Sequence, residues 1–272
     1  MISFRSVSYA YPRATAPALR DLTLDIRDGE MLAVVGANGS GKSTMGRLTN
    51  ALLWPTGGIV TVDGVATTDA GGQAEARRRV GMVFQNPDSG IVSASVEEDV
   101  AFALENRALP RAFIAEQVER TLDLLALRAH RQTHPLNLTT SDRARLGLAA
   151  AVVGDPRYLI MDEATAYLDA ADRALLMQAV QAVRSATGMA VVIITHLMDE
   201  ALAADRVAVL ADGALVYVGS PRDLFADPRR AHSWRLELPP LLRLRDLLSG
   251  YGIDIGAAAT SVEATAERLC HL

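Results

Sequence analysis

Hydrophobic and polar positions divide the opening of the chain into short strands. Residues 22–26 alternate apolar and polar side chains, residues 31–35 are all apolar, and residues 58–64 are rich in β-branched side chains and end in an Asp-Gly turn. Asp28-Gly29 has the composition of a hairpin turn. We therefore expect an antiparallel opening in which this hairpin leads into the strand at 31–35.

The middle of the chain has the periodicity of helices. After an apolar strand at 80–84, Ser95 and Glu98 have the spacing of a capping box, which predicts a helix ending near Asn106. Pro110 begins a second predicted helix, whose buried face would consist of Ile114, Val118, Leu122 and Leu125. We expect a helical subdomain over about 86–153.

Strands and helices alternate from Tyr158 onwards. The pattern predicts strands at 158–162 and 190–195, helices at 172–185 and 199–204, and a closing hairpin over 207–218. Strand–helix–strand alternation implies right-handed crossovers in a mainly parallel sheet. The predicted fold class is α/β.

The segment 221–272 differs from the rest and is predicted to be a C-terminal helical extension. Leu241, Leu244 and Leu248 recur at helical spacing. Two interpretations stay open for this leucine face: packing on the extension's own core, or a dimer contact. Acidic residues interspersed along it disfavour a helix that lies on a membrane.

Composition narrows the class of protein. The 272 residues, half of them hydrophobic, suffice for one large domain with an appendage. A net charge of −5 disfavours nucleic acid as a partner. Cys270 is the single cysteine and cannot form an internal disulfide, which fits a reducing cytosol. No apolar run reaches the roughly 18 residues that a membrane span requires.

The most specific motif lies at residues 36–44, which match the phosphate-binding pattern G-x-x-x-x-G-K-[ST] between the strand at 31–35 and a helix expected over 43–53. Glycines let such a loop curl around phosphate oxygens, and the helix N-terminus favours an anion. Lys42 would reach the β- and γ-phosphates of a nucleoside triphosphate, and Ser43 would bind Mg²⁺. The expected nucleotide-binding residues of the loop are Gly36, Asn38, Gly39, Ser40, Gly41, Lys42, Ser43 and Thr44.

Polar residues at other strand ends complete the predicted site. Asp162 ends an apolar strand and would hold Mg²⁺ with Ser43, while Glu163 would activate the attacking water. His196 follows the strand at 190–195 and is expected at the γ-phosphate, because parallel sheets bind ligands at that edge. Gln85, after its own strand, would sense metal and water.

Tyr11 could stack on adenine. Packing in the core is the alternative for this aromatic side chain.

These residues, followed by Leu168-Asp169, resemble an ABC-type ATPase over about 1–220. Residues 84–88 and 95–102, with the Leu-Glu-Leu-Pro-Pro tail, are similar to ATPase subunits of energy-coupling factor (ECF) transporters, which import vitamins or transition-metal ions. The resemblance implies a P-loop fold with a mainly parallel central sheet, an antiparallel β subdomain, a helical subdomain and a C-terminal extension. It also implies ATP and Mg²⁺ as cofactors, and Asp169 as a nucleotide contact.

The chain departs from this family at the signature motif, usually Leu-Ser-Gly-Gly-Gln, which contacts ATP bound to the opposite subunit. Here that position holds Leu138, Thr139, Thr140, Ser141 and Asp142. Thr140 and Ser141 add Cβ atoms, and Asp142 would add an anion near a phosphate; two charges about 4 Å apart at an effective dielectric near 20 repel by about 4 kcal/mol. Thr, Ser and Asp are good N-caps, so the helix that follows should still form.

The resulting hypothesis is an ATP-hydrolysing subunit of an ECF-type importer, paired with a second ATPase subunit that has an intact signature. The resemblance implies as further partners a transmembrane coupling protein and a substrate-binding membrane subunit, with the chain peripheral on the cytoplasmic face of the cell membrane. A homodimer is the alternative assembly. A non-catalytic ATP-binding regulatory clamp is the alternative function, and the presence of Glu163 argues against it.

Overall fold

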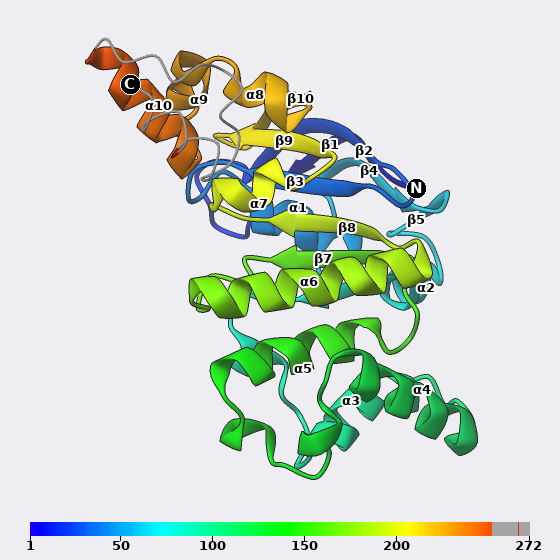
Figure 1. Cartoon of the computed structure of the whole chain (residues 1–272). Helices are drawn as coiled ribbons and strands as arrows, with labels where there is room; N and C mark the ends of the chain where they lie inside the picture. The colour runs from blue at the N-terminus through cyan, green and yellow to red at the C-terminus, as the bar shows by residue number, and fades with distance from the viewer. Residues whose placement is uncertain (252–265, 267–272) are drawn as a thin grey trace.

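A six-stranded sheet forms the centre of the molecule in the computed structural model, which describes residues 1–251 and 266 (Figure 1). Its strands lie in the order β10 (Ala214–Gly219), β9 (Arg206–Ala211), β3 (Met31–Val35), β8 (Ala190–Ile194), β7 (Tyr158–Asp162) and β6 (Val80–Val83). Neighbours from β9 to β6 pair in parallel, and β9 and β10 form the expected hairpin. Every residue of β3, β7 and β8 is buried, since both faces of a parallel sheet are covered.

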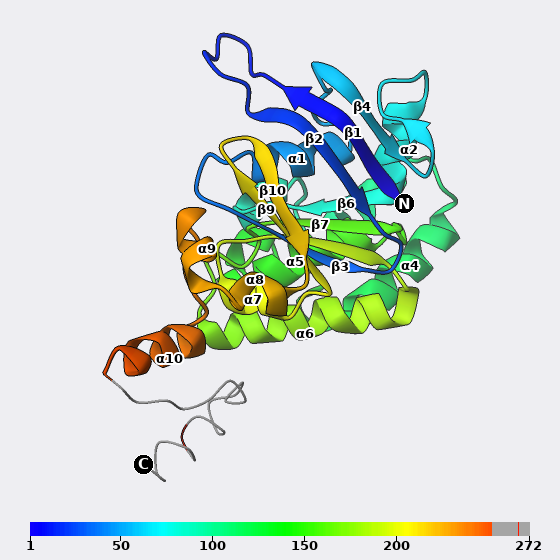
Figure 2. The same cartoon turned by 90° about the horizontal axis from the view of Figure 1, so that it is seen from above.

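A second, antiparallel sheet packs over the first (Figure 2). Its strands lie in the order β2 (Leu19–Ile26), β1 (Ile2–Tyr9), β4 (Gly57–Val62) and β5 (Val65–Ala66). The hairpin expected at Asp28-Gly29 is wrong. That turn carries the chain from β2 into the central sheet, where β3 pairs with β8 and β9. The reason is that β3 is apolar on both faces and suits a strand buried on both sides.

Helix α1 (Lys42–Thr49) lies between the two sheets, with α2 (Gly72–Arg79) nearby. Met45 and Leu48 join one hydrophobic core with side chains from both sheets. The predicted end of this helix at 53 is wrong. Asn50 accepts from the Leu52 N–H at 3.3 Å and Ala51 has a φ of +54°, so the chain leaves the helix after Thr49.

The second core, on the other face of the central sheet, joins it to the helices of the middle segment and to α6 (Ala170–Thr187). The middle segment contains η1 (Pro87–Gly90), α3 (Val96–Glu105), α4 (Arg111–Leu124), η2 (Arg128–His130), η3 (Pro135–Asn137) and α5 (Thr140–Val152). The Ser95 hydroxyl accepts from the Glu98 N–H at 3.3 Å, which confirms the predicted cap. The apolar residues expected on the buried face of α4 are buried. The limits 86–153 for a separate subdomain stay a prediction.

Two helices that pack on this same face follow β7 and β8 in the chain. Asp169 caps α6 by accepting from the Asp172 N–H at 2.9 Å, and the helix ends at Gly188 with a φ of +69°. Helix α7 (Met198–Leu202) is short and begins just after His196. Both helices lie close to their predicted positions.

Within residues 220–251, three helices follow β10: α8 (Pro221–Phe225), α9 (Pro228–Ser233) and α10 (Pro240–Gly250). The sequence pattern predicted the last of these and missed the first two. Leu241 and Leu248 are half-buried, whereas Leu244 and Leu247 are exposed, so the leucine face is divided between packing and solvent. Cys270 and most of the segment after Tyr251 lie outside the described residues. Among those that are described, no helix is long and apolar enough to cross a bilayer.

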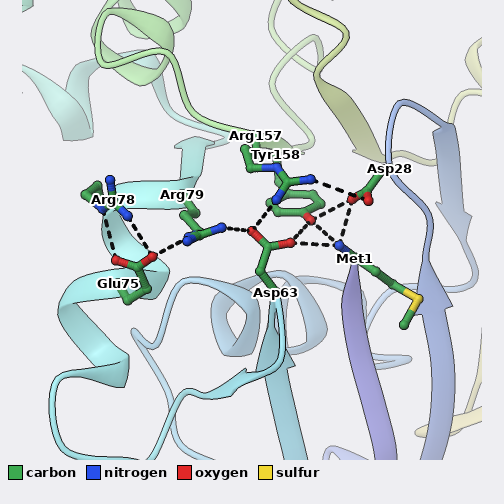
Figure 3. A network of polar contacts seen from close by, with 8 residues as sticks. All are labelled: Met1, Asp28, Asp63, Glu75, Arg78, Arg79, Arg157 and Tyr158. Carbon is green, nitrogen blue, oxygen red and sulfur yellow. Dashed lines mark hydrogen bonds and ion pairs between the residues drawn. The ribbon is translucent and has the colours of Figure 1, made fainter.

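A polar network ties the second sheet to the start of β7 (Figure 3). The hydroxyl of Tyr158 donates to Asp28 at 2.8 Å and contacts Asp63 at 2.5 Å, and the Met1 ammonium donates to both carboxylates. Burial and these carboxylates raise the pKa of Tyr158. Although burial opposes it, the Met1 ammonium, the Tyr158 hydroxyl and the Arg79 guanidinium beside it hold the pKa of Asp63 well below its ordinary value. The network therefore works with Asp63 ionised.

Candidate functional site: a phosphate-binding cleft

The glycines of the loop before α1 are required for different structural reasons. An added Cβ at Gly36 would lie 2.1 Å from the Leu210 carbonyl oxygen, and one at Gly41 would lie 2.4 Å from that of Ala18. These two positions therefore need glycine because the protein's own backbone lies against them, and their expected role at a phosphate stays a prediction. Gly39 has a φ of +80°, and a Cβ there would meet no atom within 4 Å. Gly39 and Gly41 both line the cleft, and at Gly39 the space beside the backbone is open.

Lys42 spans the same loop. Its Nζ donates to the carbonyl oxygens of Gly36 at 2.9 Å and Ala37 at 3.0 Å. Burial lowers the pKa of Lys42, while the nearby charges of Glu163 and Asp162 oppose that shift. The ammonium is thus placed over the loop with two carboxylates near it, and an incoming polyphosphate would add further negative charge.

Ser43 and Asp162 come together although 119 residues separate them. The Ser43 hydroxyl donates to the Asp162 Oδ1 at 2.7 Å. Ser43 is in the first turn of α1, and Asp162 is the last residue of β7, two strands away from β3 in the sheet. Asp162 is buried, so its carboxylate has little access to water. The pair presents two hard oxygen atoms at the edge of the cleft.

Two polar side chains lie beside the Glu163 carboxylate. Gln85 donates from Nε2 to Oε2 of Glu163 at 3.1 Å, and the Nδ1 of His196 lies 3.7 Å from the same oxygen. The Glu163 N–H donates to the carbonyl oxygen of Ile194 at 2.9 Å. Glu163 also has a φ of +50°, in the left-handed region that few residues other than glycine adopt. Its carboxylate is therefore aimed by its neighbours and by a strained backbone.

A cleft of about 490 Å³ connects these groups. Side chains and backbone of Tyr11, Asn38, Gly39, Ser43, Gln85 and Glu163 contribute to its lining. The Tyr11 ring packs edge-on against Tyr9, with centroids 4.9 Å apart, and its hydroxyl lies 3.1 Å from Oγ1 of Thr44. Tyr9 takes the core position, while Tyr11 is 38% exposed. The ring is thus available to a flat ligand.

Some residues expected at the nucleotide do not line the cleft. Ser40 is 3% exposed, and its hydroxyl is buried without a hydrogen-bond partner among the described residues, so only its backbone could meet a ligand. Asp169 uses its carboxylate as the cap of α6. Gly36 lies behind Lys42, and His196 reaches the cleft through Glu163. A contact of Asp169 with nucleotide stays a prediction.

The chemistry of the donors suits a magnesium ion. Mg²⁺ prefers hard oxygen ligands and is commonly bound by one carboxylate, a hydroxyl and phosphate oxygens. Ser43 and Asp162 supply the first two, and the amide oxygen of Gln85 lies outside the bond to Glu163. Within the described part of the chain, no group of three His, Cys, Asp or Glu side chains could hold a metal by itself. The donors therefore fit a metal that arrives with a phosphate.

The signature position is closed on itself. The Thr139 hydroxyl accepts from the Asp142 N–H at 3.1 Å and donates to the Asp142 Oδ2 at 2.7 Å. Asp142 also forms an ion pair with Arg145, and its side chain is only 9% exposed. The expectation that Asp142 presents an anion to a phosphate is therefore wrong, because the carboxylate is turned inward and paired. The predicted capping of α5 is confirmed.

Other contacts near the site escaped the sequence pattern. Arg143 pairs with Asp88 at 2.9 Å and joins the start of α5 to the turn after Gln85. Thr165, two residues after Glu163, donates to a buried oxygen of Glu200 at 2.6 Å. Arg145, Thr165 and Glu200 carry no motif of their own. For Thr165 and Glu200, the available signal is their short spacing from Glu163 and His196 at the strand ends.

The comparisons with known proteins agree with this geometry. Residues 19–166 match the family model described as ABC transporter. The energy-coupling factor transporter ATP-binding protein EcfA1 of Symbiobacterium thermophilum is 44% identical, over 98% of this chain and 95% of that protein. EcfA of Syntrophomonas wolfei is 38% identical, over 100% of this chain and 99% of that protein.

Solved structures give the same result. The structure of cbiO1 from Clostridium perfringens, described as part of the ABC transporter complex cbiONQ, has a TM-score of 0.77 at 30% identity, over 90% of this chain and 98% of that one. The ATP-binding cassette MJ0796, a dimer bound to ADP and Pi, has a TM-score of 0.73 at 26% identity, over 82% of this chain and 99% of that one. The chain belongs to the ABC transporter family, among the ATP-binding proteins of energy-coupling factor transporters.

Proposed function

We propose that this chain is the hydrolytically competent half of an asymmetric pair of ATPase subunits that powers an ECF-type importer. As a member of its family the chain binds ATP, and its hydrolysis of ATP is coupled to transport. The observation that carries the proposal is the contrast within one chain. Its own cleft brings together the loop of Lys42, the Ser43–Asp162 pair and Glu163 with Gln85, whereas its signature loop is closed on itself.

The residues of the cleft have distinct roles in this proposal. Lys42 binds the β- and γ-phosphates, and Tyr11 stacks on adenine. Ser43, Asp162 and Gln85 hold Mg²⁺, which neutralises phosphate charge when bound. Glu163 accepts a proton from the attacking water, with His196 beside the γ-phosphate. The 3.1 Å bond from Gln85 and the nearby His196 orient the Glu163 carboxylate for that role.

The signature loop explains the asymmetry. In the proposed pair, the cleft of this chain faces an intact signature on the partner, while the partner's P-loop faces residues 138–142 of this chain. Thr139 directs its hydroxyl to Asp142, and Thr140 and Ser141 carry Cβ atoms where glycines would let the backbone approach a phosphate. The repulsion expected from Asp142 does not contribute, because Arg145 pairs with it. The weaker ATP site is therefore the one at the partner's P-loop, where this chain offers fewer hydrogen-bond donors and a backbone that cannot approach the phosphate closely.

The membrane partners follow from the same assignment. A transmembrane coupling protein would receive the motion of the helical segment, and a separate membrane subunit would bind the vitamin or transition-metal ion. The chain would lie on the cytoplasmic face of the cell membrane. The exposed Leu244 and Leu247 of α10 support a contact between ATPase subunits through the extension. A purely regulatory ATP-binding clamp is disfavoured, because it would not need Glu163 in a strained conformation.

Matched changes in the two subunits test the asymmetry. The complex is purified from the native host by a tag on this chain, with either Lys42→Ala here or the same change at the P-loop lysine of the partner ATPase. Removing a preorganised phosphate ligand costs about 100-fold or more in turnover. We expect that loss for Lys42→Ala and most of the turnover retained for the partner's variant. Equal losses in the two variants would contradict the asymmetric pair.

A further inference from the structure

We propose that Thr165 and Glu200 form a buried positioning pair, which holds the loop of Glu163 against the loop of His196 during ATP hydrolysis. This inference rests on the proposed function, in which Glu163 activates the attacking water. Neither residue lines the cleft, so both would act through the residues that they position.

The pair connects two loops that lead to the cleft. Thr165 lies two residues after Glu163, and Glu200 lies four residues after His196 on α7. The Thr165 hydroxyl donates to Oε1 of Glu200 at 2.6 Å, and both side chains are buried, at 3% and 5% exposure. A hydrogen bond to a carboxylate is stronger than one between neutral groups, and water has little access to compete for this one. The two loops are thus joined directly beneath the site.

The backbone of Glu163 needs such support. Its φ of +50° is unfavourable for a residue with a Cβ, and such conformations persist only where the surroundings over-determine them. The Glu163 N–H is fixed to Ile194, and its carbonyl oxygen accepts from the Ala166 N–H at 3.0 Å. Thr165 lies inside that turn, so its bond to Glu200 anchors the turn to α7. Without this anchor, the loop could relax and carry the carboxylate away from His196.

Packing alone does not explain a glutamate at position 200, because burying its carboxyl group is unfavourable. Its second oxygen, Oε2, is buried and has no hydrogen-bond partner within the described part of the chain. Burying a carboxyl group with an unsatisfied oxygen costs free energy that an apolar side chain of similar size would not. A carboxyl group at this position is therefore explained by the strong acceptor that it offers to Thr165.

Substitution of Thr165 in the complex tests the pair. Thr165→Val keeps the shape and removes the hydroxyl, and Thr165→Ser keeps the hydroxyl. We expect Thr165→Val to lower kcat for ATP hydrolysis at least about tenfold, because it removes one charge-assisted hydrogen bond. The KM for ATP should stay unchanged. Serine should restore most of kcat. In the full chain, amide hydrogen exchange of residues 163–168 and 196–201 should be faster in the Thr165→Val variant than in the wild type.

A second pair of variants covers the case in which Thr165→Val does not fold. Glu200→Gln keeps an acceptor oxygen and should lose less kcat than Glu200→Met, which has none. A wild-type kcat in the Thr165→Val variant would overturn the inference, and so would equal kcat values in Glu200→Gln and Glu200→Met. Glu163→Gln in the same complex separates the two proposals. If the Glu163→Gln variant still hydrolyses ATP, the proposed function is wrong. If Glu163→Gln is inactive while Thr165→Val is fully active, only the positioning pair is wrong.

Discussion

Gln85 donates from Nε2 to the Oε2 of Glu163 at 3.1 Å, although 78 residues separate them in the chain. His196 lies 3.7 Å from the same oxygen. The three residues follow β6, β7 and β8, which are neighbours in the central sheet. One carboxylate oxygen at the end of β7 thus has polar neighbours from the two adjacent strands, at the edge where parallel sheets bind ligands.

Glu163→Gln should abolish hydrolysis while leaving ATP binding intact. The amide keeps the size of the side chain but cannot accept a proton, and a general base contributes about 100-fold or more to a rate. Turnover of the complex and ATP affinity are measured side by side. Glu105→Gln, the same change on the exposed surface of α3, is the control. Turnover above a few per cent in Glu163→Gln would show that another group activates the water.

Asp162→Asn should remove the effect of magnesium on ATP binding. The carboxylate bonded to Ser43 is the strongest oxygen donor at the cleft, and an amide is a poor substitute for it. ATP affinity of the full chain is compared with Mg²⁺ and with EDTA. Asp199→Asn, an exposed carboxylate after His196, provides the control. An Asp162→Asn variant whose affinity still rises with Mg²⁺ would place the metal elsewhere.

Apolar strands and the polar residues at their ends could be predicted from the sequence. Parallel strands place their carboxyl ends at one edge, so Gln85, Asp162 and Glu163 were expected to converge. Side-chain direction could not be predicted, because it depends on neighbours distant in the chain. The Asp142 carboxylate turns inward because it bonds to Thr139 and Arg145. The Asp28-Gly29 turn connects two sheets because β3 pairs with β8, which lies far along the sequence.

Asp142→Asn should lower stability and should not raise ATP turnover. The carboxylate is paired with Arg145 and accepts a hydrogen bond from the Thr139 hydroxyl, so its loss costs about 1–3 kcal/mol of unfolding free energy. Urea unfolding of the full chain and turnover of the complex provide the two readouts. Increased turnover with unchanged stability would indicate that the carboxylate does face a phosphate.

Asp63→Asn should destabilise the chain in a pH-dependent way. The pKa of Asp63 is lowered from an ordinary 3.8, so its stabilisation is complete above that value and is lost as the pH falls through the lowered pKa. We expect a deficit of about 2 kcal/mol at pH 7 that shrinks below about pH 4. Urea unfolding across this range measures it, with exposed Asp69→Asn as the control. A deficit independent of pH would contradict an ionised Asp63.

The asymmetric pair is tested most directly by ATP turnover of the purified full chain without its partners, measured at concentrations where it forms dimers. The wild type is compared with a double variant, Thr140→Gly and Ser141→Gly, which restores the two small residues of the signature. Recovering even about 1.4 kcal/mol of phosphate binding is a tenfold effect. We predict little turnover for the wild type and at least about tenfold more for the double variant. Robust turnover by the wild-type chain alone would contradict the asymmetric pair.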